Sequence, residues 1–457
     1  MHRDTWIRGR RLAFSALCAL AIVPASLEGK DPEKGWKGTE NALKSAILAS
    51  RFDVAAEIVT ELAASDDPRG YELIVKVALG GHDHALDLHA GRLVAGASDP
   101  KIRQVVYDCV KSGRNYKATI VLLAVLKRWD DDPAAVAALV SALESPRKEV
   151  VFAALRWVRG LADQKISVPA LVALLDRHER KARGRIYFDT KRALLEITGH
   201  DLPTALDWRN YVKAIESGQP PPKPPREGKT VLYKPPTFFS VAVESDRVLF
   251  VIDVSTSMSI EDTIIEEKPR APRDAPRGGG SGRTVVDPEG GSDGGTTVER
   301  IAPRQVSRME RVKKELSETI AELPSDVRFN IMSFSHELAW FEPSGTLVIS
   351  SETSRERALQ WVRNLQPNGA TRTDKAVDEA FKPSEVDTIY LLTDGAPKDE
   401  QNQAIPAESV LRLASSLNRF RKSRIHTIGF SQAGRSMREF VLALARENDG
   451  KCVLLEK

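Results

Sequence analysis

The sequence contains little cysteine, which excludes a scaffold held together by disulfides. Its 457 residues include three cysteines, and one of them, Cys18, lies in a segment that we expect to be cleaved. Cys109 and Cys452 fall in different predicted domains, so we expect two buried free thiols, with a single inter-domain disulfide as the alternative. Stability must come from apolar cores, and a chain of this length supports two or three of them.

Strong charge of one sign is also lacking. The net charge is +4, and aromatic residues make up 6% of the chain. No segment interleaves basic and aromatic residues, so the composition predicts no nucleic-acid partner. Gly-x-Ser-x-Gly, Walker A, HExxH and CxxC motifs are all missing. We therefore predict a protein that is not an enzyme.

The chain has no apolar run long enough to span a bilayer. The longest candidate, Leu12 to Val23, follows several arginines and ends at Pro24-Ala25. A spanning helix needs about 20 apolar residues. A basic head, a short apolar run and a small-residue exit are typical of a secretory signal peptide, with a membrane anchor as the alternative. We expect residues 1–25 to be removed, leaving no integral membrane segment, and the protein to be exported (periplasmic, cell-surface or secreted).

Residues 39–217 have helical periodicity almost throughout. Asp132-Pro133 and Ser145-Pro146 each open a short amphipathic segment, and Val168-Pro169 starts a further pair. Two short helices per unit are typical of an α-solenoid, and the units resemble HEAT repeats; a generic helical bundle is the alternative. Solenoids present extended surfaces, so this part is a candidate second binding face for a partner.

The pattern changes after the helical part. Residues 218–240 contain Pro220-Pro221-Pro222, which favours a stiff polyproline II linker. In residues 245–457, continuous apolar runs such as Val248 to Ile252 alternate with helical segments. This predicts a doubly wound, mostly parallel α/β domain, in which ligands bind at the carboxyl ends of the strands.

Oxygen-bearing side chains follow the predicted strands at those ends. The first strand ends in Asp253-Val254-Ser255-Thr256-Ser257, Asn368-Gly369-Ala370-Thr371 lies in a loop before a helix, and Thr393-Asp394-Gly395 closes a later strand. These segments, in this order, resemble the metal-ion-dependent adhesion site of the von Willebrand factor A family. Ala370 departs from the family, which often has glycine there. The resemblance extends from about Arg247 to the end of the chain.

The resemblance implies a metal site formed by Asp253, Ser255, Ser257, Thr371 and Asp394. Mg²⁺ takes six oxygens at about 2.0–2.1 Å and keeps some waters; Mn²⁺ and Ca²⁺ are alternatives. In the family, the hydroxyls bind directly and the aspartates act mainly through water. An Asp or Glu of a protein partner then completes the coordination.

A long insertion, residues 261–303, directly follows the first metal motif. Gly, Ser, Pro and Asp dominate it, and this composition predicts disorder. Its carboxylates at Glu261, Asp262, Glu266 and Glu267 lead to the hypothesis that it blocks the open metal position. A passive insertion is the alternative.

Two further clusters of polar residues suggest chemistry by residue type. His82-Asp83-His84 with Asp87 and His89 has metal-binding residue types, but Gly80-Gly81 favours a solvated helix start. Ser335-His336-Glu337 has the residue types of a hydrolase triad. On a strand, neighbouring side chains point to opposite faces, which argues against that reading.

Taken together, the patterns predict an exported, non-enzymatic adhesion protein that binds an acidic residue of its partner through Mg²⁺. One alternative is a structural scaffold that binds through the helical repeats and has a vestigial metal site. The other is a non-catalytic subunit of a larger assembly.

Overall fold

The computed structural model describes residues 32–161, 163–179, 184–220, 233–264, 304–399, 401 and 403–456. The predicted signal peptide, most of the Pro-rich segment and residues 265–303 of the insertion lie outside these ranges. The chain divides into two compact units, residues 1–105 and 106–457. Within the described ranges, no helix has both the length and the apolar character needed to cross a membrane.

The first unit is helical. Its elements are α1 (Pro32–Leu48), α2 (Phe52–Ala64), α3 (Pro68–Leu73), the π-helical turn η1 (Ile74–Ala78), α4 (His84–Ala95) and the start of α5 (Pro100–Ser112). The first helix begins at Pro32, earlier than the predicted start of the helical region at residue 39. Aspartates cap the N-termini of α3 and α4, since the Asp67 and Asp83 carboxylates accept hydrogen bonds from the backbone N–H groups of Arg69 and Leu86. His84 begins α4, so the histidine cluster lies at a helix start, as predicted.

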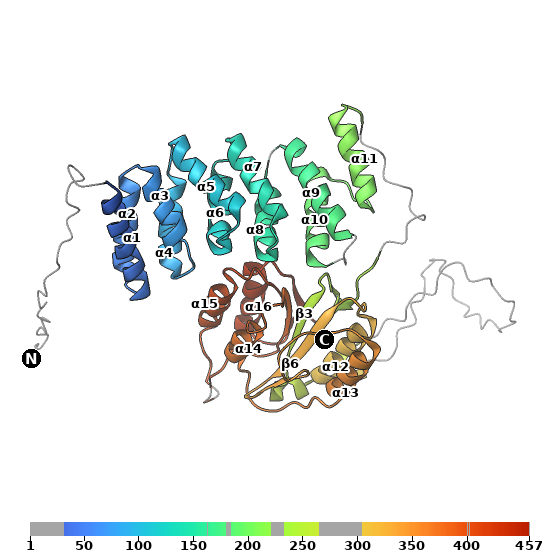
Figure 1. Ribbon diagram of the computed structural model, residues 1–457. Coiled ribbons are helices and arrows are strands. Elements are labelled where there is room, and N and C mark those ends of the chain that lie inside the picture. Colours follow the sequence, from blue (N-terminus) through green and yellow to red (C-terminus); the bar gives the residue numbers. More distant parts are fainter. Residues whose placement is uncertain are drawn as a thin grey trace, which may run out of the picture. The chain divides into compact units, whose positions relative to one another are not determined.

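Short helices also open the second unit. They are α6 (Tyr116–Arg128), α7 (Pro133–Ser141), the 3₁₀ turn η2 (Ala142–Glu144), α8 (Lys148–Val158), α9 (Gln164–Glu179), α10 (Arg185–Thr198) and α11 (Ala205–Glu216). Pro169 lies inside α9 and does not start it, contrary to the prediction. Helix α7 packs with α6 and α8, and α9 packs with α10 and α11. Helices α6, α8 and α10 also pack in sequence on one another, which gives a stack of helical pairs (Figure 1).

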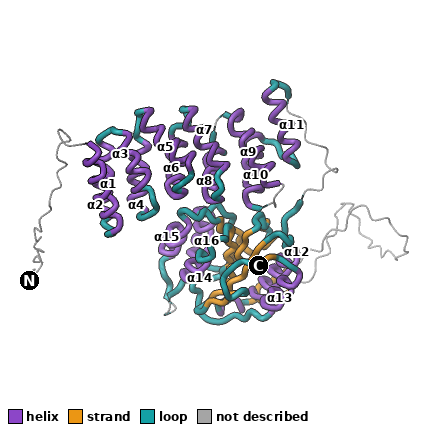
Figure 2. The backbone as a smooth tube through the Cα atoms, in the orientation of Figure 1, coloured by secondary structure: helices purple, strands orange, loops and turns teal. Residues whose placement is uncertain are grey.

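The remainder of this unit is an α/β domain with a central, mostly parallel sheet (Figure 2). Parallel strands β3 (Arg247–Asp253), β6 (Arg328–Phe334), β9 (Thr388–Leu392), β10 (Arg424–Phe430) and β11 (Cys452–Leu455) form it. Two short strands, β7 (Leu338–Trp340) and β8 (Val348–Ile349), pair antiparallel with β6. The strand order is β11-β10-β9-β3-β6-β7, with β3 between β6 and β9. The chain adds β6 on one side of β3 and then β9 to β11 on the other, so the strand order reverses at β3.

Alternating residues of β3 bury both faces of the sheet. Phe250 and Ile252 pack with α12 (Arg308–Glu322) and α13 (Glu352–Arg363). Leu249 and Val251 pack with α14 (Thr373–Ala380), α15 (Ala407–Asn418) and α16 (Arg435–Glu447). The continuous apolar run is thus explained by burial on both sides, as predicted for a doubly wound sheet.

The α/β core begins earlier than residue 245. Strand β1 (Thr237–Phe238) lies within the segment predicted as linker and forms a hairpin with β2 (Val241–Ala242), which directly follows that segment. The Phe238 ring is fully buried and lies 5.4 Å from the Phe250 ring. The Tyr390 hydroxyl donates to the carbonyl of Ala242 at 2.7 Å. The last residues of the predicted linker are therefore part of the core of this domain.

The insertion begins and ends in regular structure. Its first residues form β4 (Glu261–Ile264), which pairs antiparallel with β5 (Arg304–Ser307) directly before α12. The stretch predicted to be disordered from residue 261 thus starts as a strand. Neither Cys109 nor Cys452 forms a disulfide, and both are half-buried instead of buried.

Candidate metal centre at the carboxyl end of the sheet

Asp253 ends β3 at the position where the chain order reverses, and both of its carboxylate oxygens have partners. Oδ1 accepts the backbone N–H of Ser255 at 2.8 Å, and Oδ2 accepts the Thr393 hydroxyl at 2.7 Å. The Asp253 side chain is fully buried. Burial and the nearby Asp394 charge together raise the pKa of the Asp253 carboxyl above its usual value.

The two serines of the first motif point toward Asp394. Ser257 lies in a short 3₁₀ turn, η3 (Thr256–Ser259), that the buried Met258 anchors. The Ser255 and Ser257 hydroxyl oxygens are 3.1 Å apart, and the Ser257 hydroxyl donates to Asp394 Oδ1 at 2.7 Å. A chain of oxygens therefore runs from the end of β3 to the loop that follows β9.

Thr371 reaches the same place from a third loop. The backbone N–H groups of Asn368 and Thr256 donate to the carbonyls of Val254 and Gly369, at 2.6 and 3.0 Å, which joins this loop to the first motif. Thr371 is buried, and a Cβ added to Gly395 would lie 2.6 Å from its hydroxyl oxygen. The structure thus gathers all of the predicted residues, Asp253, Ser255, Ser257, Thr371 and Asp394, at one edge of the sheet.

Gly369 explains why one glycine of this loop is retained while Ala370 is tolerated. Its φ is +80°, and a Cβ there would lie 1.9 Å from His336 Nδ1. Both the left-handed backbone and the close approach of the imidazole exclude a side chain at position 369. Ala370 is not among the residues with positive φ in the described ranges, so its backbone conformation accepts a side chain.

Arg308 is a component of the site that the sequence did not predict. Its guanidinium NH1 group donates to Asp394 Oδ2 at 2.8 Å, and both side chains are buried. The same guanidinium lies 4.9 Å from the Phe430 ring centre and 3.5 Å from Asp262 Oδ2 on β4. The sequence contains a hint of this role. Arg308 is the first residue of α12, directly after the N-cap Ser307 of a Ser307–Glu310 capping box, and a basic residue is unfavourable there because it opposes the helix dipole.

The donor set fits a hard divalent cation. Hydroxyl and carboxylate oxygens are the ligands that Mg²⁺ prefers. The Asp394 carboxylate has one oxygen paired to Arg308, while the other accepts from Ser257. In the described ranges no group of three or more His, Cys, Asp or Glu side chains has metal-binding geometry, so hydroxyl groups are essential to this candidate site.

The Ser335-His336-Glu337 segment is a turn between β6 and β7, not part of a strand as predicted. The Ser335 hydroxyl lies 3.4 Å from His336 Nδ1, and His336 Nε2 lies 4.0 Å from Glu337. The neighbouring side chains therefore meet, although both separations are long. The exposed Glu337 and the long Ser–His contact do not give the geometry of an activated nucleophile.

The fold and the loop chemistry together define a doubly wound α/β domain with an oxygen-lined site at its switch point. Residues 302–453 match the family model described as von Willebrand factor type A domain. The C-terminal part of the chain is a domain of this type. The match includes Thr371 and Asp394 and begins downstream of Asp253.

Two human proteins are similar to part of the chain. The identity is 31% over 123 residues with von Willebrand factor A domain-containing protein 3A, which is 27% of this chain and 10% of that protein. It is 30% over 147 residues with von Willebrand factor A domain-containing protein 3B, which is 32% of this chain and 10% of that protein. The chain thus matches about a tenth of the length of each relative.

Solved structures also resemble the chain at low similarity. A von Willebrand factor type A protein from Catenulispora acidiphila matches with 18% identity and a TM-score of 0.31, over 47% of this chain and 40% of the other. The PilB minor pilin from Streptococcus sanguinis matches with 16% identity and a TM-score of 0.28, over 46% of this chain and 56% of the other.

Proposed function

We propose that the α/β domain binds Mg²⁺ through Asp253, Ser255, Ser257, Thr371 and Asp394, and that the metal engages an Asp or Glu of a protein partner. The observation that carries this proposal is the continuous set of oxygens from Asp253 to Asp394 at the switch point of the sheet. A von Willebrand factor A domain suggests an interaction or adhesion role. Mn²⁺ and Ca²⁺ are alternative ions.

The charge balance of the site supports a cation there. Two buried aspartates, Asp253 and Asp394, face the serine hydroxyls, and Arg308 supplies one positive charge to Asp394. Buried carboxylates need compensating charge. A divalent ion would supply that charge and, with coordination positions left over, would attract a partner carboxylate.

The proposal assigns no catalysis to this chain. The Ser335 hydroxyl and His336 Nδ1 are 3.4 Å apart, which is too long for the contact of a general base with an activated nucleophile. Export remains part of the proposal because of the basic and apolar pattern of residues 1–25. Mass spectrometry of the secreted or envelope-bound protein would test it, since a mature N-terminus near residue 26 is expected.

Isothermal titration of the full chain with Mg²⁺ and Mn²⁺ tests the metal site. We expect Ser257→Ala to lower the affinity by about 10–100-fold, because it removes a direct oxygen and the contact to Asp394. Ser259→Ala is a matched control in the same turn, because the Ser259 hydroxyl donates to the Thr256 carbonyl and is exposed. Equal affinities for the two variants would contradict the site.

Partner binding is tested by capture on the immobilised chain with Mg²⁺ or with EDTA. The proposal expects capture in Mg²⁺ that is lost in EDTA and in Asp253→Ala. Capture that resists both treatments would instead support the alternative of a scaffold that binds through its helical repeats.

A further inference from the structure

A cavity of about 290 Å³ lies where α8 and α10 meet the α/β domain. Arg424 opens β10, and Lys451 directly precedes β11. Because these strands run parallel to β3 and β9, the cavity lies at the edge of the sheet opposite the candidate metal centre. Its volume approaches the lower end of the range for small-molecule sites, about 300–1,000 Å³.

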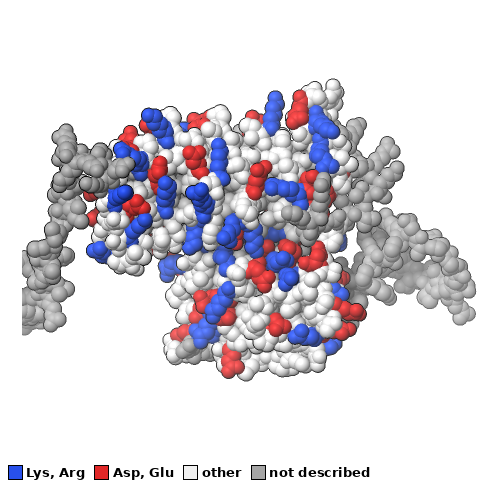
Figure 3. Space-filling view, in the orientation of Figure 1, with Lys and Arg blue, Asp and Glu red and all other residues white. Residues whose placement is uncertain are grey.

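Positive charge dominates the wall of this cavity. Two acidic residues line it, Asp189 and Asp449, against six basic ones: Arg156, Arg159, Arg185, Arg192, Arg424 and Lys451. Figure 3 shows Lys and Arg side chains gathered where the helices lie against the α/β domain. The excess of basic over acidic residues points to an anionic occupant.

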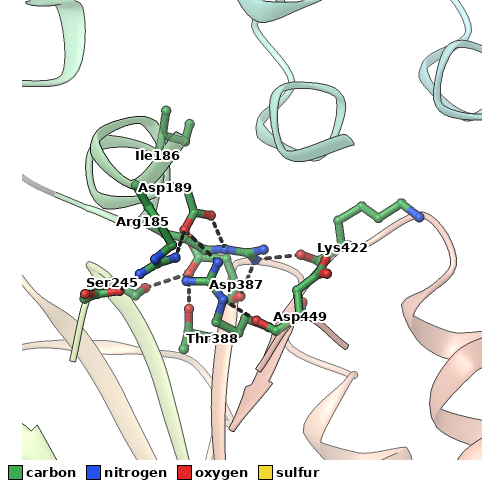
Figure 4. Close-up of polar contacts among 12 residues, drawn as sticks. Arg185, Ile186, Asp189, Ser245, Asp387, Thr388, Lys422 and Asp449 are labelled. Carbon is green, nitrogen blue, oxygen red and sulfur yellow. Dashed lines mark hydrogen bonds and ion pairs between the residues drawn. The ribbon is translucent and has the colours of Figure 1, made fainter. Parts of the chain in front are cut away.

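Part of the positive charge is neutralised by the protein itself. Asp189 pairs with Arg185 and Arg192 of its own helix and with Arg424 of β10. Figure 4 shows Arg185 beside Asp189 and near Asp387 and Lys422. The Arg185 NH1 group also donates to the carbonyls of Asp387 and Lys422, at 2.8 and 2.6 Å. These arginines connect the helices to the α/β domain and line the base of the cavity.

The remaining cations are available to a ligand. Arg156 and Lys451 are exposed and form no ion pair within the described residues, and Arg159 has a long, half-exposed contact of 3.4 Å with Glu196. Such exposed pairs are weak. Arg156 lies on α8 and Arg159 is the helical C-cap three residues later, which places their side chains on one face.

His426 adds a buried donor to the same wall. Its ring is 4% exposed and stacks on Tyr390, and its Nδ1 accepts the backbone N–H of Lys451 at 3.0 Å. Burial and the positive charges of Arg424 and Arg185 hold the pKa of His426 well below its ordinary value. Because Nδ1 accepts a hydrogen bond, the neutral ring carries its proton on Nε2, and His426 lines the cavity.

We infer that this cavity binds a small molecule that carries a phosphate group, held by Arg156, Arg159, Lys451 and the Nε2–H of His426. Phosphate oxygens accept several charged hydrogen bonds at once, and guanidinium groups match their geometry. A phosphate dianion also offsets the charge of Arg156 and Lys451, which have no acidic partner in the described ranges. Phe152 and Leu155 provide an apolar wall for the rest of the molecule.

Calorimetric titration of the full chain with inorganic pyrophosphate, in metal-free buffer, tests this inference. We expect saturable binding that weakens by about tenfold for each charged hydrogen bond removed. The double variant Arg156→Gln/Lys451→Gln should therefore lose roughly 100-fold in affinity. Both positions are exposed, so the fold is retained.

The control variant, Lys165→Gln/Lys213→Gln, makes the same change in net charge at exposed positions outside this cavity. It should bind pyrophosphate like the wild type, as should Asp253→Asn, because the metal centre lies at the other edge of the sheet. Absence of saturable binding, or an equal loss in both double variants, would overturn the inference. Citrate binding as tightly as pyrophosphate would overturn the assignment to phosphate.

Discussion

The NH1 group of Arg308 lies 2.8 Å from Asp394 Oδ2, and both side chains are buried. This buried ion pair attaches the first residue of α12 to the loop that closes the candidate metal centre. The Arg308 guanidinium also lies 3.5 Å from Asp262 on β4. The start of the insertion and the metal loop thus share one cation.

Replacing Arg308 tests how far the site depends on that cation. Arg308→Met leaves Asp394 and Asp253 buried without it, so the free energy of unfolding should fall by about 3–5 kcal/mol in EDTA. Saturating Mg²⁺ should recover part of the loss, because the metal supplies positive charge at the same carboxylate. Chemical denaturation with and without Mg²⁺ measures both effects.

Arg311→Met is the matched control for this experiment. Arg311 contacts Asp262 at 3.4 Å from the same helix face but has no contact with Asp394. In Arg311→Met the free energy of unfolding should fall by less than in Arg308→Met, and the fall should not depend on Mg²⁺. An identical Mg²⁺ response in the two variants would contradict the role of Arg308.

Gly395 tests the placement of Thr371 without removing any oxygen. In Gly395→Ala the new methyl group would lie 2.6 Å from the Thr371 hydroxyl, so Thr371 must move. We expect a loss of about tenfold in Mn²⁺ affinity by calorimetry. Gly434→Ala adds a methyl group with nothing within 4 Å, and it should bind Mn²⁺ normally; a shared loss would exclude this explanation.

Arg185 links the helices to the α/β domain. Arg185→Met leaves the carbonyls of Asp387 and Lys422 without this donor, and we expect the free energy of unfolding to fall by about 2–4 kcal/mol. Arg209→Met breaks a partly exposed pair with Asp176 and should cost less than about 1 kcal/mol. Thermal and urea unfolding compare the two; equal costs would show that the Arg185 contacts contribute little.

His426 predicts a pH dependence of stability. The pKa of His426 is well below 6.5 in the folded chain, so below about pH 6.5 the unfolded chain binds a proton that the folded chain does not. Stability should therefore fall between about pH 7 and pH 5, by up to ~1.4 kcal/mol per pH unit from this residue.

Urea denaturation across this pH range checks the prediction. His426→Gln should reduce the slope, because it removes the titrating group. His82→Gln, at an exposed position before α4, should leave the slope close to that of the wild type. A slope unchanged by the His426 substitution would show that other groups cause the pH dependence.

The sequence predicted those features that depend on local periodicity. Val248 to Ile252 lies buried on both sheet faces, and the polar residues that follow the strands meet at one edge because parallel strands end there. This geometry makes the positions of Asp253 and Asp394 predictable from the order of the strands.

The features that were not predicted depend on tertiary contacts. Phe238 follows a proline-rich stretch, so nothing local distinguishes it from a linker, although its ring packs on Phe250 and Tyr390. The usual preference of proline predicts that Pro169 starts a helix, yet it lies inside α9. Arg424 meets Asp189 across a separation of 235 residues, which no local periodicity encodes.

The pairing of β4 with β5 has a consequence for how this domain varies. The hairpin brings Ile264 and Arg304 side by side, so residues 265–303 leave and return at neighbouring points. The entropy of closing a loop rises only with the logarithm of its length, by about 0.6 kcal/mol per doubling. Segments of quite different length can therefore be inserted between Ile264 and Arg304 while Arg308 keeps its position, so the domain tolerates insertions at this hairpin.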